Sequence, residues 1–137
     1  MIPNPEPERK YPWQGEFDAD RANTVEAGIG SVSAVGCFGG GESPYGAEEI
    51  AGNVWEWTRS RWDRFEYPYD PDDGRERIDS ISNRERRVLR GGAFSYASRL
   101  ARCAYRSWDY PDYRDGNIRV SDGGVSVQAL ISDPLIL

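Results

Sequence analysis

The chain has 137 residues, a length that suits a single domain, and it carries a net charge of −6. This charge argues against nucleic acid as a partner, because a phosphate backbone would be repelled. No stretch approaches the roughly 20 apolar residues that a membrane-spanning helix needs, so we expect no membrane partner either. The sequence contains no histidine, which excludes any site that needs imidazole from this chain as a base or a metal ligand.

The two cysteines of the chain, Cys37 and Cys103, lie far apart in the sequence. We expect them to be two separate buried thiols in preference to a disulfide. The first ten residues, MIPNPEPERK, are charged and rich in proline, which is unlike a signal peptide and typical of a disordered lead-in. The compartment is left open, with the cytoplasm as the default expectation.

The first half of the chain is expected to consist mostly of loops. Residues 11–17 are aromatic around a glycine turn, a composition that favours packing at an edge. Residues 23–30 are small and polar, which favours a loop. Residues 47–51 are compatible with one helical turn before a bend at Gly52 and Asn53.

A short strand is expected to follow this bend. Alternation along it places Trp55 and Trp57 on one face and Val54 and Glu56 on the other. Two large aromatic side chains on one face fill a core. The carboxylate of Glu56 is then either solvated or engaged with a metal or a hydrogen-bond donor, and the spacing alone leaves both interpretations open.

The second half combines a long polar segment with short strands. Residues 59–86 are polar, contain prolines and show little periodicity, which predicts a long loop. The mixed charges of residues 63–90 predict a solvated surface. A short strand is predicted at residues 88–90, and residues 102–107 alternate as a further strand would, with Cys103 on one face. The chain as a whole is therefore expected to be α+β, with short strands, long loops and little helix.

The segment GNVWEWT at residues 52–58 resembles the signature of the sulfatase-modifying-factor family, which includes the formylglycine-generating enzyme. Ergothioneine sulfoxide synthases and the variable proteins of diversity-generating retroelements are related to it. Further family segments occur in the same order: YPWQGEFD at 11–18, RANTVEAGIG at 21–30, SPYGAEEIAG at 43–52, RVLRGGAF at 87–94, RCAYRS at 102–107 and NI at 117–118. The resemblance covers residues 11–118 and implies an irregular, C-type-lectin-like fold.

Both ends differ from the family pattern. A segment similar to RLPTEAEWE normally precedes the YPW motif, and none occurs here, so the resemblance covers the C-terminal portion of a family domain. Members usually continue after the NI motif with Gly-Phe-Arg and an apolar strand. Here RVSDGG follows Ile118, and one allowed set of its codons gives Gly-Phe-Arg-Met-Val one base later. We hypothesise a frameshift, with residues 119–137 as an off-frame tail that has no reason to pack; ordinary divergence is the alternative.

The resemblance implies that calcium is the metal of this scaffold. One calcium site of the family is built around the GNVWEW motif. Carried over to this sequence, its ligands are the side chains of Glu49 and Glu56 and the backbone carbonyls of Gly52 and Val54. Hard oxygen ligands that converge from a bend and a strand suit calcium.

A second calcium site of the family maps to the loop at residues 23–30. Its ligands would be the side chain of Asn23 and the carbonyls of Thr24 and Ile29. The acidic ligand expected at this site falls on Ala27, which leaves the neighbouring Glu26 as a substitute.

Copper is not expected in this chain. The catalytic members of the family bind copper with two cysteine thiolates shortly after the RGG motif. The corresponding residues 93–101 contain no cysteine, and Cys103 matches a non-catalytic position. Because a lone thiol cannot form the paired site, the resemblance leans against an enzyme. The alternatives are an oxidase completed by a partner chain and a fragment without function.

Residues 95–116 are a candidate binding surface for an unidentified protein or small molecule. Many family members carry asparagines here, whereas this chain carries mainly tyrosine, serine and aspartate, which are common at binding surfaces. Their codons differ from that of asparagine largely at adenines, as adenine-directed mutagenesis in diversity-generating retroelements would leave them; ordinary drift on an exposed loop is the alternative. The candidate ligand-binding residues are Tyr96, Arg106, Trp108, Asp109, Tyr110, Tyr113 and Asp115.

Overall fold

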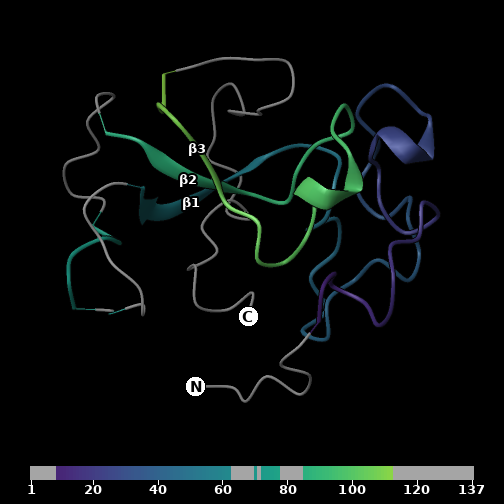
Figure 1. Cartoon of the computed structure of the whole chain (residues 1–137), viewed down its shortest axis with the longest axis horizontal. Coiled ribbons are helices and arrows are strands. Elements are labelled where there is room, and N and C mark those ends of the chain that lie inside the picture. The colour runs from purple at the N-terminus through teal and green to yellow at the C-terminus, as the bar shows by residue number, and fades with distance from the viewer. Residues whose placement is uncertain (1–8, 63–69, 71, 78–84, 113–137) are drawn as a thin grey trace.

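The computed structural model describes residues 9–62, 70, 72–77 and 85–112 (Figure 1). In chain order its elements are the 3₁₀ helix η1 (Val25–Ala27), the strands β1 (Glu56–Arg61) and β2 (Arg87–Arg90), the 3₁₀ helix η2 (Ser98–Leu100) and the strand β3 (Ser107–Asp109). Irregular segments make up the rest of the described chain, as 15 glycines and nine prolines favour. The α+β character, with short strands and little helix, is confirmed. The expected tail at 119–137 lies outside the described residues.

The three strands form one antiparallel sheet in the order β1-β2-β3, so β2 lies in the middle. All four residues of β2 are buried, which is the position expected of a central strand. Trp57 pairs with Leu89 and Arg61 pairs with Arg87, so three residues of β1 face the single residue Val88. The resulting bulge is held by Thr58, whose hydroxyl donates a hydrogen bond to the Val88 carbonyl at 3.1 Å.

The buried hydrophobic side chains form two small clusters. One contains Tyr11, Trp13, Ala22, Ala51 and Ala101. The other contains Trp55, Leu89 and Ala93, with the partly buried Trp57, Leu100 and Tyr105 packed against it. The expectation that the two tryptophans of GNVWEWT share a core is confirmed. In the segment 11–17, which was expected to pack at an edge, Tyr11 and Trp13 are buried and stacked with their centroids 5.5 Å apart.

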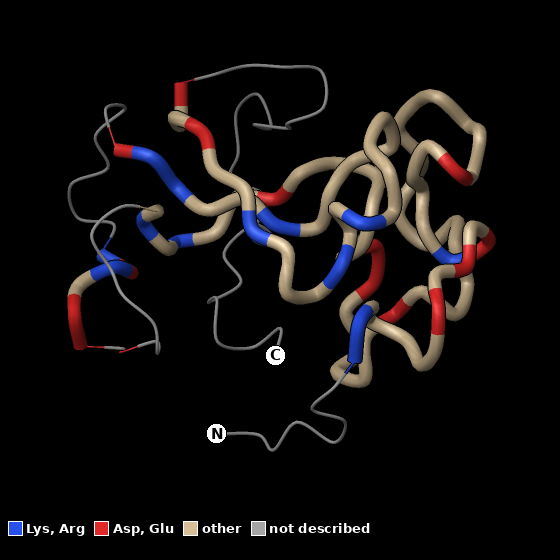
Figure 2. The backbone as a smooth tube through the Cα atoms, viewed as in Figure 1, with Lys and Arg blue, Asp and Glu red and all other residues tan. Residues whose placement is uncertain are grey.

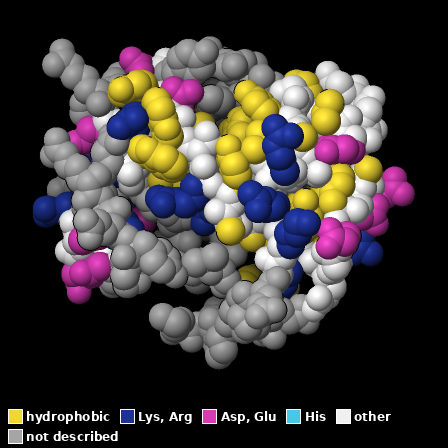
Figure 3. Space-filling view, viewed as in Figure 1, with side chains coloured by type: hydrophobic (Ala, Val, Ile, Leu, Met, Phe, Trp, Pro, Cys, Tyr) yellow, Lys and Arg dark blue, Asp and Glu magenta, His cyan; other side chains and the backbone are white. Residues whose placement is uncertain are grey.

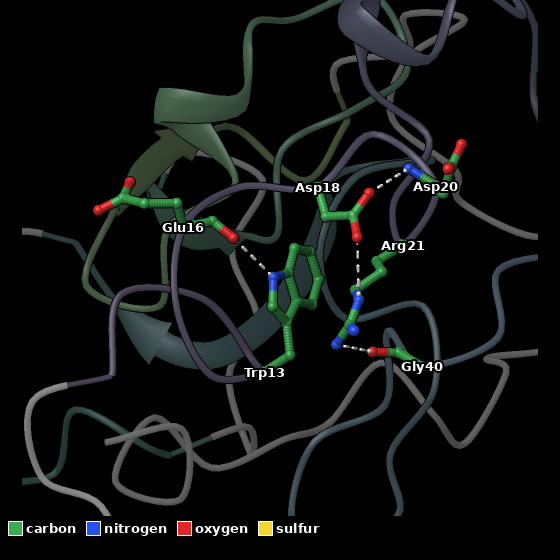
Figure 4. A network of polar contacts seen from close by, with 6 residues as sticks. All are labelled: Trp13, Glu16, Asp18, Asp20, Arg21 and Gly40. Atoms are coloured by element: carbon green, nitrogen blue, oxygen red, sulfur yellow. Dashed lines mark hydrogen bonds and ion pairs between the residues drawn. The ribbon is translucent and has the colours of Figure 1, made fainter.

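A polar network closes the loops around the first cluster (Figure 4). The indole nitrogen of Trp13 donates to the carbonyl of Glu16 at 3.1 Å. The guanidinium of Arg21 donates to the carboxylate of Asp18 at 3.2 Å and to the carbonyl of Gly40 at 3.2 Å. A single side chain thereby connects the RANT segment to the glycine-rich loop at residues 36–41.

The Gly52-Asn53 bend joins three segments that are distant in sequence. The amide of Gly52 donates to the carbonyl of Gly91 at 2.7 Å, and the amide of Asn53 donates to the carbonyl of Asn23 at 2.7 Å. The amide of Phe94 donates to the carbonyl of Asn53 at 2.9 Å. Both bend residues have positive φ angles, 80° and 64°. We call these contacts the hub; they place the RANT, GNVWEW and RGG segments side by side.

Two expected elements are absent from their predicted positions. Residues 47–51 form no helical turn, and Glu49 adopts a positive φ of 55°, which is incompatible with a right-handed turn. The strand predicted at 102–107 is wrong, since residues 101–104 form a bend and a turn and β3 begins only at Ser107. The backbone carbonyls of Cys103 and Tyr105 accept hydrogen bonds from the side chain of Arg90 and not from a neighbouring strand. The alternation of side chains in this segment therefore does not indicate a strand.

The described residues of the segment 63–90, which was predicted to be a solvated surface, are less solvated than their charges suggested. Basic and acidic residues alternate along the described part of it (Figure 2), yet Arg75, Arg87 and Arg90 are buried. The guanidinium of Arg87 donates to the carbonyls of Arg59 at 2.6 Å and Arg77 at 3.3 Å, which accounts for its burial. The predicted loop also begins too early, because residues 59–61 belong to β1.

The cysteines are both free thiols, as expected, but only one of them has the expected environment. Cys37 is exposed on the glycine-rich loop, whereas Cys103 is half-buried. Within the described residues, no helix is long and apolar enough to cross a membrane.

We predict that Gly52→Ala destabilises the fold by about 3 kcal/mol, because a methyl group there would combine backbone strain with a steric clash. A Cβ atom at Gly52 would lie 2.4 Å from the carbonyl oxygen of Asn23, at a φ of +80°. Gly28→Ala is the matched control, since Gly28 has a φ of +74° but nothing within 4 Å. The control should cost about 1 kcal/mol. Urea unfolding measures both changes, and equal losses would contradict the importance of the close approach.

Candidate functional site

One side of the sheet carries a set of aromatic and basic side chains. Strand pairing places Trp108 beside Val88, and side chains of one strand alternate between the two faces, so Arg106, Trp108 and Tyr110 lie on the Val88 side. The amide of Trp62 donates to the carbonyl of Arg86 at 2.9 Å, which brings the ends of β1 and β2 to the same place. We call Trp62, Arg86, Arg106, Trp108 and Tyr110 the tryptophan–arginine face.

The side chains of this face stack on one another. The ring centroids of Trp62 and Trp108 are 6.4 Å apart, and the rings of Trp108 and Tyr110 meet edge to face at 6.1 Å. The guanidinium carbon of Arg86 lies 4.4 Å from the centroid of Trp108, and that of Arg106 lies 5.3 Å from the centroid of Trp62. Each distance is within the range of a cation–π interaction.

The stacked face is open to solvent at its centre. Trp108 is 39% exposed and Tyr110 is 40% exposed, a large fraction for aromatic side chains. Hydrophobic side chains are visible over β3, with basic side chains next to them (Figure 3). An exposed group of aromatic side chains with neighbouring arginines has the composition of a binding surface.

The predicted binding residues are brought together only in part. Arg106, Trp108 and Tyr110 belong to the face, and Asp109 adjoins it, with its carboxylate accepting a hydrogen bond from the amide of Tyr110 at 2.8 Å. Tyr96 packs edge-on against Trp55 at 5.7 Å, on the core side of the hub. The remaining two predicted residues, Tyr113 and Asp115, lie outside the described residues.

Sequence reasoning missed Trp62 and Arg86. Both fall within the segment expected to be a solvated loop, and neither stands in a motif. The only signal that could have found them is the pairing of β1 with β2, which is set by contacts between distant residues. A tryptophan at the end of an otherwise polar strand is compatible with that role but does not predict it.

The segment just before the hub contains Glu49, whose carboxylate has no hydrogen-bond partner. Both carboxylate oxygens of Glu49 are buried and accept no hydrogen bond. Burial raises the pKa of Glu49, and the nearby amides of Phe38 and Gly36 offset this only in part, since neither reaches hydrogen-bonding geometry. A buried carboxylate in this state is costly unless a cation lies next to it.

Glu56 has a similar environment at the start of β1. It is half-buried, and burial raises its pKa to about 7. Among the described residues, no three His, Cys, Asp or Glu side chains form a group that could hold a metal. The calcium site expected at this bend differs from such a group, because it combines two carboxylates with two backbone carbonyls.

The loop at residues 23–30 fits a cation less well. The side-chain oxygen of Asn23 is buried and accepts no hydrogen bond, which suits a metal ligand. However, the carbonyl of Thr24 already accepts a hydrogen bond from the amide of Ala27 at 3.0 Å. Ile29 is exposed. Glu26, the possible substitute for the acidic ligand, is engaged elsewhere.

The carboxylate of Glu26 links the two 3₁₀ helices. It accepts hydrogen bonds from the amide of Ser98 at 2.8 and 3.1 Å and from the hydroxyl of Thr24 at 2.7 Å. Partial desolvation raises the pKa of Glu26, but these hydrogen bonds lower it more, to about 2. The group therefore acts as a structural clasp between the RANT loop and the segment after the RGG motif.

The segment after the RGG motif contains no paired thiols. Residues 93–101 are all described and include no cysteine. Cys103 donates its amide to the carbonyl of Lys10 at 2.9 Å. Burial raises the pKa of its thiol, and the nearby guanidinium groups of Arg9 and Arg90 lower it in part. A protonated, half-buried thiol is a poor nucleophile and a poor copper ligand.

Comparison with known proteins agrees with the motifs around the hub. The family model of the sulfatase-modifying factor enzyme 1-like domain matches residues 6–120. The chain therefore belongs to the sulfatase-modifying factor family.

Several curated relatives match the same region. A hercynine oxygenase of Mycolicibacterium smegmatis is 28% identical over 114 residues, which are 75% of this chain and 25% of that protein. The formylglycine-generating enzyme of Mus musculus is 34% identical over 116 residues, 77% of this chain and 27% of the enzyme. An inactive C-alpha-formylglycine-generating enzyme 2 of Bos taurus is 29% identical over 118 residues, 82% of this chain and 33% of that protein. The chain thus spans a quarter to a third of the length of these relatives.

We predict that Glu26→Gln lowers the free energy of unfolding at neutral pH by about 1 kcal/mol, a modest amount because the carboxylate is exposed and screened. The pKa of Glu26 in the folded chain lies below its ordinary value of 4.5. The ionised group therefore stabilises the fold above that value, and its contribution is lost as the pH falls toward the folded pKa. Urea unfolding should show that the deficit of the variant shrinks between about pH 5 and pH 3. Glu42→Gln, at an exposed carboxylate, is the control. A loss of unfolding free energy in Glu26→Gln that does not change with pH would contradict the role of the ionised Glu26 carboxylate.

Proposed function

We propose that this chain is a non-catalytic, C-type-lectin-like domain that binds a protein or small-molecule ligand through the tryptophan–arginine face. The observation that carries this proposal is the exposure of Trp108 and Tyr110 beside two stacked guanidinium groups. Rigid aromatic side chains and arginines are the residue types that contribute most to binding at protein surfaces. The hub supports the face, because it fixes the chain just before β1 and just after β2.

The residues argue against formylglycine generation by this chain. The two thiolates that bind copper in catalytic members have no counterpart at residues 93–101, and the thiol of Cys103 is half-buried and has a raised pKa. The relatives include enzymes and a protein named as inactive, so family membership alone does not decide activity. The rival function, an oxidase completed by a partner chain, has no described residue in its favour.

We also propose that calcium binds and stabilises residues 49–56, which include the bend of the hub. Glu49 and Glu56 would contribute carboxylate oxygens, and Gly52 and Val54 would contribute carbonyl oxygens. The support for this is the burial of both Glu49 oxygens without a hydrogen-bond partner. When bound, calcium would supply the positive charge that compensates the two carboxylates. The site at Asn23, Thr24 and Ile29 is a weaker proposal, because Glu26 is already engaged with Ser98.

We predict that calcium raises the melting temperature of the purified chain by several degrees, because an ion that binds only the folded state stabilises it. The measurement is a thermal melt followed by circular dichroism at about pH 8, above the pKa of Glu56. Glu49→Gln should abolish the shift, whereas Glu48→Gln, at the adjacent exposed carboxylate, should retain it. The same shift in wild type and Glu49→Gln would contradict the proposed ligand.

We predict that Trp108→Ala lowers the affinity of the chain for its ligand by about tenfold or more, because the substitution deletes the central ring of the face. An arrayed library of short peptides, probed with the labelled chain, measures the loss. Tyr45→Ala is the matched control, since Tyr45 is 44% exposed but lies outside the face. A library in which no bound peptide depends on Trp108 would contradict the proposed function.

A further inference from the structure

The tryptophan–arginine face already holds cations over its rings. The guanidinium of Arg86 lies over Trp108 and that of Arg106 lies over Trp62. A cationic ligand would compete with these groups for the ring faces and would be repelled by their charge. The arrangement therefore discriminates against ammonium ligands and favours anionic ones, even though the chain as a whole is acidic.

Planar guanidinium groups are well suited to carboxylates. Arginine offers five N–H donors in a fixed plane, and a carboxylate can accept two of them at once. Stacking on a tryptophan fixes this plane in advance, which reduces the entropy lost when an anion binds. The exposed rings of Trp108 and Tyr110 add apolar area next to the donors. A matching ligand carries carboxylates and an apolar side chain close together.

The geometry limits the length of such a ligand. Arg86 is joined to Arg106 through the two tryptophan rings by steps of 4.4, 6.4 and 5.3 Å. The two guanidinium groups are therefore no farther apart than the reach of about five extended residues. Two acidic side chains in one short segment can engage both arginines while the residue between them covers the tryptophans.

We infer that the ligand of the tryptophan–arginine face is an acidic peptide segment of a partner protein, with an apolar or aromatic residue between two carboxylates. This inference rests on the proposed binding function and specifies its ligand. The rest of the chain disfavours a longer polyanion, because its net charge is −6.

The test is fluorescence anisotropy with a labelled, end-blocked peptide of sequence Glu-Glu-Trp-Glu-Glu. Its uncharged counterpart, Gln-Gln-Trp-Gln-Gln, is the control ligand, and labelled oligothymidylate represents nucleic acid. We expect the acidic peptide to bind the wild-type chain at least about tenfold more tightly than either control ligand.

Two arginine variants separate local contact from general charge. Arg106→Ala and Arg102→Ala each remove one positive charge, and both side chains are exposed. Arg102 lies outside the face and donates to the carbonyl of Arg99 at 2.8 Å. We expect Arg106→Ala to weaken binding of the acidic peptide about tenfold and Arg102→Ala to weaken it less than about twofold. Equal weakening by both variants would overturn the inference.

The remaining outcomes also decide the matter. Equal affinity for the acidic and uncharged peptides, or tighter binding of oligothymidylate, would overturn the acidic-peptide ligand. So would the absence of binding by the acidic peptide. In each of these cases the arrayed library tests the proposed binding function separately. If the library contains bound peptides of another chemistry whose binding depends on Trp108, the binding function stands. If it contains no such peptide, the binding function is refuted as well.

Discussion

The structure depends on the hydrogen bonds that the Gly52-Asn53 bend makes with two segments distant in sequence, one at Asn23 and one at residues 91–94. Three short backbone contacts, each about 3 Å or less, connect the bend to Asn23, Gly91 and Phe94. The side chain of Asn53 adds further contacts: it accepts from the amide of Ser33 at 2.9 Å, from the Ser33 hydroxyl at 3.3 Å and from the side-chain amide of Asn23 at 3.4 Å, and it donates to the Ser33 carbonyl at 3.1 Å. A chain with so little regular structure has few other ways to hold distant segments together. Buried contacts of this kind contribute about 1 kcal/mol each, and losing one partner costs more than that.

The two small aromatic clusters lie on either side of these contacts and explain why so thin a core suffices. Ala51 belongs to one cluster and Trp55 to the other, so the bend between them positions both. Glycine is required where backbones approach closely, as at Gly52, where an added Cβ atom would lie 2.4 Å from the carbonyl oxygen of Asn23. The binding face follows from the same constraint. The hub fixes where β1 begins and where β2 ends, and the sheet then carries Trp62 and Trp108 to one surface.

Sequence motifs predicted the parts of the chain that local chemistry determines. The family, the α+β class, the shared core of Trp55 and Trp57 and the short strand at 88–90 all followed from motifs or alternation. Prediction failed where distant contacts decide the outcome. Arg87 and Arg90 resemble surface residues until the carbonyls that accept their hydrogen bonds are known. Trp62 and Arg86 become part of a site only through strand pairing. Glu49 was expected to be a ligand, but neither its positive φ nor its burial could be read from the sequence.

The bulge in β1 has a consequence for how this surface could change in evolution. Three residues of β1 stand opposite one residue of β2, which is an excess of two. Because side chains of a strand alternate with a period of two, an even excess leaves Trp62 on the same face that it would occupy in a regular strand, but moves it along the sheet. A deletion of two of the residues 58–60 would therefore remove the bulge but keep Arg61 paired with Arg87 and Trp62 beside Arg86. A deletion of one would turn it to the opposite side. The surface therefore tolerates an even change in the length of the polar stretch at residues 58–60, whereas an odd change would remove Trp62 from the surface without altering any residue on it.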